Sequence, residues 1–144
     1  LWQETWSHLA ASHEAKKIHL EDQTGEAELR CRVDPFALAQ VIRNIFENAL
    51  QVTPDGGRLV VRTGKAEIDG SPGFWIGFHD SGPGLDPEQR ERIFEPFFTT
   101  KAKGTGLGMA IARRIMQSHG GQIEVGSRPD PGAEIVLILP RDAE

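Results

Sequence analysis

The fold of this chain is decided by residues 34–52, DPFALAQVIRNIFENALQV. Asp34 is a typical helix N-cap, and Pro35 suits the first helical position. Apolar residues then recur every three or four positions over a wide arc, which predicts a long and well-buried helix. The segment PDGG at 54–57 follows, and its proline and glycines are typical of a helix end.

On the amino-terminal side of this helix, two further elements are predicted. Good helix formers with apolar residues three or four apart predict one helix over residues 2–16. Alternation on either side of Thr24-Gly25 predicts a hairpin of two strands, at 18–20 and 29–33.

On the carboxyl side, alternating segments dominate. They predict strands at 59–63 and 74–80 around a turn at 69–73, and a final hairpin at 123–125 and 135–139. Helices are expected at 87–93 and 107–118. We therefore predict an α+β fold, a two-layer α/β sandwich in which a mixed sheet of about five or more strands carries helices on one face.

Length and composition narrow the class of protein. The 144 residues suit one domain, and a formal net charge of −5 without a basic run argues against a nucleic-acid surface. The lone Cys31 cannot form an internal disulfide, and no apolar run approaches the roughly 20 residues of a membrane span. We expect a cytoplasmic domain without direct membrane contact. The first residue, Leu1, is not Met, which suggests a piece of a longer protein that can be membrane-anchored elsewhere.

Two asparagines lie on one side of the central helix. Asn44 and Asn48 are four residues apart, so their side chains emerge on the same face, and Gln51 is close to the same line. An amide oxygen suits Mg²⁺, which keeps several waters and takes phosphate oxygens for the rest of its shell. The alternative is that both amides sit on the solvent edge of an amphipathic helix.

A first glycine-bearing segment is DSGPG at 80–84, directly after a predicted strand. A buried carboxylate at Asp80 can accept the exocyclic amine of adenine, and the glycines let the chain approach a planar base. An ordinary Asp-Gly turn is the alternative.

A second such segment, GTGLG at 104–108, stands where a loop becomes a helix. Its amides and the positive end of the helix can receive a phosphate group. The spacing is neither that of the phosphate loop nor that of the dinucleotide fingerprint. Lys101 and Lys103 precede it and can neutralise phosphate charge, although solvated lysines on a loop are the plainer interpretation.

Taken in order, these segments resemble a known family. Asn44-x-x-x-Asn48, DSGPG at 80–84, FEPFF at 94–98 and GTGLG at 104–108 are similar to the N, G1, F and G2 boxes of the ATP-binding domain of two-component sensor histidine kinases. This domain belongs to the GHKL, or Bergerat, superfamily. The segment EPFFTTK at 95–101 separates the histidine kinases from the gyrase, Hsp90 and mismatch-repair ATPases that share the fold.

The resemblance implies ATP and Mg²⁺ as cofactors. It implies that Asn48 coordinates the metal, that Asn44 helps to hold the metal or the phosphates, and that Asp80 binds the adenine amine. It also implies a long lid over the nucleotide, from about residue 85 to 105. The nucleotide-binding residues are then Asn44, Asn48, Gln51, Asp80, Gly82, Gly84, Leu85, Thr100, Lys101, Lys103, Gly104, Thr105, Gly106, Leu107, Gly108 and Ala133.

Two positions depart from the family pattern. Gln51 stands where many relatives have Lys, so Lys101 or Lys103 is expected to take over the contact with phosphate. Ala133 stands where relatives often have Thr, and a water molecule is the expected replacement for the missing hydroxyl.

The resemblance also implies transfer of the γ-phosphoryl group to a histidine on a separate dimerisation domain, with a response regulator as an indirect partner. Of the five histidines, only His13 lies in a similar context, Ser12-His13-Glu14. It lacks the following proline and lies only about thirty residues before Asn44, so we expect an ordinary surface histidine. Residues 1–16 are predicted to be a helix that follows the dimerisation domain, and residues 17–144 the catalytic domain.

Two other functions fit parts of the sequence. A nucleotide-sensing regulatory module without catalysis is supported only by Gln51. An ATPase of the gyrase or Hsp90 kind usually has Glu at the position of Asn44, where it activates water. The sequence identifies no catalytic residue, although Glu47, about 100° round the helix from Asn48, is a secondary candidate for proton handling.

Overall fold

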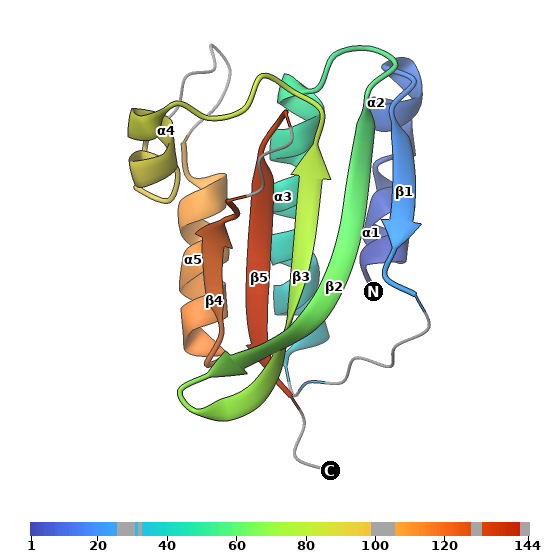
Figure 1. Ribbon diagram of the computed structural model, residues 1–144. Coiled ribbons are helices and arrows are strands. Elements are labelled where there is room, and N and C mark those ends of the chain that lie inside the picture. The colour runs from blue at the N-terminus through green and yellow to red at the C-terminus, as the bar shows by residue number, and fades with distance from the viewer. Residues whose placement is uncertain (26–30, 32, 99–105, 128–130, 142–144) are drawn as a thin grey trace.

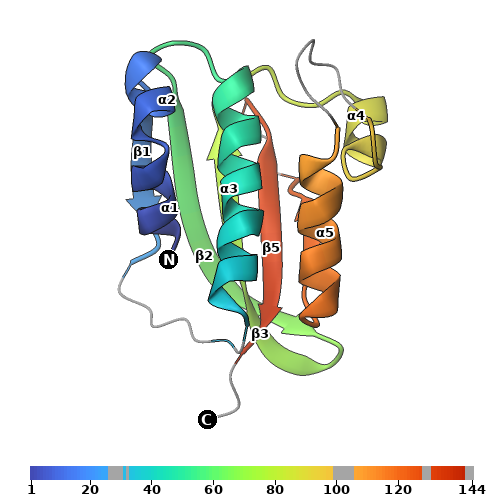
Figure 2. The ribbon, with the colours of Figure 1, turned by 180° about the vertical axis from the view of Figure 1, so that it is seen from behind.

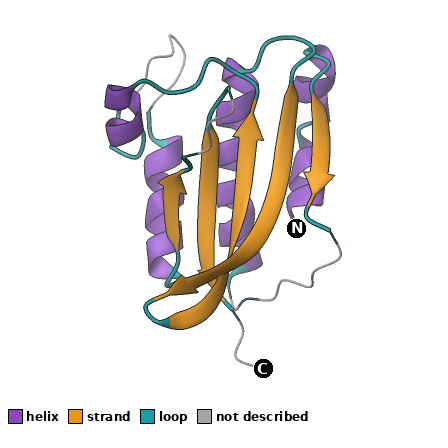
Figure 3. Cartoon of the chain, viewed as in Figure 1, coloured by secondary structure: helices purple, strands orange, loops and turns teal. Residues whose placement is uncertain are grey.

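The computed structural model describes residues 1–25, 31, 33–98, 106–127 and 131–141. Figure 3 colours its helices purple, its strands orange and its loops and turns teal. In chain order they are α1 (Trp2–His8), α2 (Ala10–Ala15), β1 (His19–Gln23), α3 (Pro35–Val52), β2 (Arg58–Ile68), β3 (Ser71–Asp80), α4 (Pro87–Arg92), α5 (Gly108–Ser118), β4 (Gln122–Val125) and β5 (Glu134–Pro140).

The strands form one mixed sheet in the order β1-β2-β3-β5-β4. The β1–β2 pair is parallel and the other pairs are antiparallel. Helices α1, α3 and α5 lie along one face, whereas the described chain places no helix on the other face (Figures 1 and 2). The edge strands, β1 and β4, have only five and four residues. The predicted two-layer α+β fold is confirmed.

Helix α3 is the centre of the core, as its apolar period predicts. Asp34 Oδ1 accepts the amide of Phe36 at 2.9 Å, and Pro35 occupies the first turn. Phe46 is fully buried, and its ring meets Trp6 edge-on at 5.2 Å and Phe78 at 5.4 Å between centroids. One aromatic cluster therefore joins α1, α3 and β3.

The prediction of one helix over residues 2–16 is wrong, because the helix is interrupted at Leu9. The carbonyl oxygen of Trp6 accepts the Leu9 amide at 3.1 Å and faces Nε2 of His13 at 3.2 Å, so a tight turn replaces the regular helical bond. The imidazole stacks on Trp6, with 4.1 Å between ring centroids. His13 is therefore half-buried and packed, rather than a plain surface residue.

Lys16 connects this amino-terminal segment to the end of α3. Its Nζ donates to the carbonyl oxygens of Leu50 at 2.6 Å and Thr53 at 3.1 Å. Its own carbonyl oxygen accepts the Gly56 amide at 2.7 Å. The lysine thus satisfies carbonyl groups that the last turn of a helix leaves without helical partners.

In the predicted hairpin of strands 18–20 and 29–33, the second strand falls largely outside the described residues, and the first strand has a different partner. Strand β1 pairs in parallel with β2, from His19 opposite Arg58 to Gln23 opposite Arg62. Cys31 and Val33 lie in no strand, and Leu29 lies outside the described residues. Alternation identifies a strand, but it does not identify the partner of that strand, which here is 35 or more positions further along the chain.

The remaining predictions of secondary structure are confirmed within a few residues. The β2–β3 turn is shorter than predicted, because only Asp69 and Gly70 connect the strands. Both have positive φ, 51° and 78°, which matches the right-handed twist of long paired strands. The final hairpin is formed by β4 and β5, although residues 128–130 of its connection lie outside the described residues.

Candidate functional site

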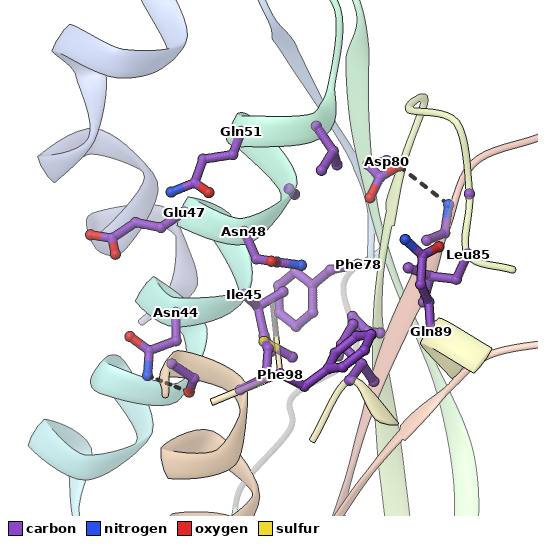
Figure 4. Close-up of a pocket in the computed structure, with 18 of the residues that line it drawn as sticks. Asn44, Ile45, Glu47, Asn48, Gln51, Phe78, Asp80, Leu85, Gln89 and Phe98 are labelled. Carbon is purple, nitrogen blue, oxygen red and sulfur yellow. Dashed lines mark hydrogen bonds between the residues drawn. The ribbon is translucent and has the colours of Figure 1, made fainter. Parts of the chain in front are cut away.

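A cavity of about 370 Å³ opens between α3, the end of β3, helix α4 and the start of α5 (Figure 4). Many of the residues predicted from sequence line it: Asn44, Glu47, Asn48, Gln51, Asp80, Gly84, Leu85, Gly106, Gly108 and Ala133. Gly82 and Leu107 adjoin it in sequence but are not among the lining residues. Thr100, Lys101, Lys103, Gly104 and Thr105 lie outside the described residues.

The two asparagines of α3 have different surroundings. Asn44 is buried; its Nδ2 donates to the carbonyl oxygen of Gly108 at 2.9 Å, and its Oδ1 accepts Gln40 Nε2 at 2.9 Å. This side chain therefore fixes the start of α5 against α3. Asn48 is half-buried one turn further along and lies on the cavity side of the helix (Figure 4). Of the two amides, that of Asn48 is better placed to meet a ligand.

Asp80, the last residue of β3, forms the opposite end of the cavity. It is buried, and its Oδ1 accepts the amides of Gly82 at 2.9 Å and Ala133 at 3.2 Å. Among the described residues, none donates a hydrogen bond to Oδ2. Burial raises the pKa of this carboxyl above its ordinary value of 3.8, and the hydrogen bonds from Gly82 and Ala133 and the charge of His79 oppose that rise. The carboxylate therefore has one oxygen held by the protein and one oxygen for a donor on a ligand.

Gly132 allows this arrangement by lying against the backbone of Asp80. Its φ is +100°, and a Cβ at this position would overlap the carbonyl oxygen of Asp80. The Asp80 amide donates to the carbonyl oxygen of Ala133 at 2.9 Å, so the chain from Gly132 to Ala133 supports Asp80 from both its backbone and its side chain. Only glycine tolerates the conformation and the close approach together.

The start of α5 is suited to an anion. Leu107 is the N-cap, and a leucine side chain cannot accept a capping hydrogen bond, so no side chain at the N-cap competes with an anion for the positive end of the helix. Gly106 has a φ of +73°, and its carbonyl oxygen accepts the Phe97 amide at 2.9 Å. Gly106 is therefore held against the FEPFF segment at 94–98.

Several lining residues were not among the site residues predicted from the sequence, and Gln89, Ile93 and Phe98 are three of them. Phe98 belongs to the FEPFF segment, which identified the family and lies within the lid predicted for residues 85–105. Gln89 carries a local signal, since Asp86-x-x-Gln89 is the pattern of a helix capping box. Neither signal indicates that these residues would face α3 across a cavity.

Glu47, the secondary candidate for proton handling, also lines the cavity. Its Oε1 accepts Arg43 Nε at 2.8 Å in an exposed ion pair along α3. The structure thus brings Glu47 near the site, and its role stays a prediction. Within the described residues, no three His, Cys, Asp or Glu side chains gather closely enough to hold a metal by themselves.

The arrangement has a distinct polarity from end to end. The Asp80 carboxylate lies at one end, the Asn48 amide and the start of α5 lie toward the other, and apolar side chains such as Ile45 and Phe78 line the cavity (Figure 4). A planar base with an amino group fits the first end, and an anionic group fits the second.

Comparisons with known proteins agree with this geometry. Residues 33–143 match the family model of histidine kinase-, DNA gyrase B- and HSP90-like ATPases. The sensor histidine kinase ZraS of Salmonella typhi is 39% identical over 127 residues, which are 88% of this chain and 27% of ZraS. This chain thus spans about a quarter of the length of that relative.

Solved structures show the same fold. The nucleotide-free catalytic domain of the histidine kinase ThkA superposes with a TM-score of 0.84 at 29% identity, covering 97% of this chain and 90% of that domain. ThkA in complex with the response regulator protein TrrA gives a TM-score of 0.79 at 26% identity, over 97% of this chain and 39% of that chain. Among the described residues, no helix is long and apolar enough to cross a membrane. The chain therefore belongs to the family of histidine kinase-, DNA gyrase B- and HSP90-like ATPases, as an ATPase catalytic domain of the sensor histidine kinase type.

Proposed function

We propose that this chain binds Mg²⁺-ATP and presents the γ-phosphoryl group to a histidine on a separate dimerisation domain. The observation that carries the proposal is the polarity of the cavity, with Asp80 at one end and Asn48 and the start of α5 at the other. Oδ2 of Asp80 accepts the adenine amine, and the first amides of α5 receive the phosphates. Phosphoryl transfer depends mainly on positioning and charge neutralisation, which such a site can supply.

The donor set fits Mg²⁺. This ion is usually held by one or two protein oxygens together with phosphate oxygens and waters. Asn48, with help from Asn44, offers amide oxygens, and the described residues offer no cluster of three acidic or histidine ligands that would form a cage of protein groups alone. When bound, the metal neutralises charge on the phosphates. Lys101 and Lys103, which lie outside the described residues, complete the phosphate end in this proposal.

The partners and the setting of the chain follow from the same proposal. Residues 1–16 follow the dimerisation domain, and a response regulator receives the phosphoryl group afterwards. The complex of ThkA with TrrA supports such a partner, because a kinase similar to this chain binds a response regulator. We infer a cytoplasmic setting, in a full-length protein that can be anchored in a membrane.

A transfer assay tests the proposed function. The chain is mixed with γ-labelled ATP, alone and with a separately produced dimerisation domain of its own full-length protein. We expect label on the added domain, abolished when its acceptor histidine is replaced, and little label on this chain. Strong labelling of the chain alone, lost in His13→Gln, would instead identify an internal acceptor.

Asn48→Ala tests the metal site. In the parent, Mg²⁺ should tighten binding of a non-hydrolysable ATP analogue. In the variant we expect the factor by which Mg²⁺ tightens this binding to be about tenfold smaller than in the parent. A change of this size corresponds to one contact with a charged group. Calorimetric titration with and without Mg²⁺ measures both. Adenosine, which has no phosphate to share the metal, is the control ligand and should bind both proteins alike. An unchanged Mg²⁺ gain in the variant would contradict the assignment.

A further inference from the structure

Helix α4 begins with a reciprocal pair of hydrogen bonds. Asp86 Oδ1 accepts the Gln89 amide at 2.8 Å, and Gln89 Oε1 accepts the Asp86 amide at 2.9 Å. The helix has six residues and buries none of them. Because so short a helix is marginal by itself, these capping bonds contribute much of its local stability.

The same Gln89 side chain lines the cavity. It is half-buried and lies beside Leu85, on the wall opposite α3 (Figure 4). The Asp86 amide can only donate, so the capping bond assigns the oxygen of the Gln89 amide to the cap. The Nε2 group, with two N–H donors, is then the part of Gln89 that remains for a ligand. Among the described residues, none accepts a hydrogen bond from Nε2.

We propose that Gln89 is a specificity-determining contact that donates a hydrogen bond from Nε2 to an acceptor atom of the nucleoside half of bound ATP. The inference rests on the proposed function and deepens it. Asp80 supplies an acceptor for the adenine amine, while the ring nitrogens of adenine and the oxygens of ribose are acceptors that need a donor. Gln89 supplies that donor from the facing wall.

This contact couples nucleoside binding to the order of α4. A nucleoside that fixes the Gln89 amide also fixes the side chain that caps the helix. On the other side of α4, Arg90 Nη2 donates to the carbonyl oxygen of Gly126 at 3.0 Å, which ties the helix to the end of β4. Occupation of the cavity should therefore protect the amides of residues 86–93 from hydrogen exchange.

Three variants separate the donor from the cap. Gln89→Glu keeps an oxygen for the Asp86 amide and removes both donors. Gln89→Met removes the donors without adding charge. Asp86→Ala weakens the cap but leaves the Gln89 amide in place. Adenosine is the ligand, because it is neutral and meets no phosphate residue. We expect both Gln89 variants to bind adenosine about tenfold more weakly than the parent, and Asp86→Ala to bind within about threefold of it.

Calorimetric titration measures these affinities, and thermal unfolding reports the cap. A loss in Gln89→Glu alone would indicate charge repulsion from Asp80 and would overturn the proposal. Equal losses in Asp86→Ala and the Gln89 variants would also overturn it, since Gln89 would then act only through the helix. If the parent bound neither adenosine nor ATP, the proposed function itself would fail. Parent-like binding by Gln89→Met would refute only the role of Gln89.

Discussion

Asp80→Asn is expected to weaken binding of adenosine and of ATP about a hundredfold, because in the proposed binding mode a charge-assisted hydrogen bond is replaced by two donors that face each other. Asparagine can keep Oδ1 as the acceptor for the amides of Gly82 and Ala133, so the local fold should persist. Its Nδ2 then stands where Oδ2 stood and meets the adenine amine. Calorimetric titration of both ligands measures the loss, and tight binding by the variant would show that Asp80 does not contact the base.

The same substitution should stabilise the nucleotide-free chain near neutral pH. Burial raises the pKa of Asp80 in the folded state, so the carboxyl binds its proton more readily when folded than when unfolded. The resulting stabilisation is complete below the unfolded value near 3.8 and is lost as the pH rises through the folded pKa. Above that window the ionised Asp80 costs stability, and Asn avoids the cost.

Urea unfolding between pH 3 and pH 7, a range of roughly four units around ordinary carboxyl titration, checks this expectation. The free energy of unfolding of Asp80→Asn, relative to the parent, should increase with pH. Asp55→Asn replaces an exposed carboxyl and is the control, for which we expect little change. A variant that is less stable than the parent at pH 7 would contradict the argument.

Phe46→Ala is expected to lower the free energy of unfolding by about 3–5 kcal/mol. The side chain is fully buried and meets Trp6 and Phe78, so its removal leaves a cavity between α1, α3 and β3. Domains of this size are stable by only about 5–15 kcal/mol, so much of the stability would be lost. Urea unfolding, with comparison of the m-values, measures the change.

Phe36→Ala is the matched control on the same helix. Phe36 is 86% exposed, so its truncation should change the free energy of unfolding by no more than about 0.5 kcal/mol. Equal losses in the two variants would mean that burial in the aromatic cluster does not determine the effect. Because Phe78 also lines the cavity, Phe46→Ala should in addition weaken adenosine binding, though less than Asp80→Asn does.

Local signals explain what the sequence predicted well. The cap at Asp34, the apolar period of α3 and the alternation of β2, β3, β4 and β5 all act over a few residues, and the structure follows them. The site residues of α3 were predictable for the same reason, since helical geometry alone puts Asn44 and Asn48 on one face.

Nonlocal contacts explain what it predicted poorly. The partner of β1 is a strand some forty residues later, and the break at Leu9 depends on a stack between Trp6 and His13. Gln89 has a clear local role as a capping residue, yet its place in the cavity depends on how α4 is positioned across the cavity from α3. Such relations arise from the folded chain as a whole and leave no periodic trace in the sequence.

The short strands at the two sides of the sheet affect how copies of this domain behave at high concentration. A second copy that adds to β1 or β4 could extend a ladder over only five or four residues, and Glu21, Asp22 and Glu124 place negative charge along those strands. Few hydrogen bonds would be gained, and like charges would be brought together. The described sheet therefore resists growth into intermolecular β-structure, which favours a domain that stays dispersed at high concentration.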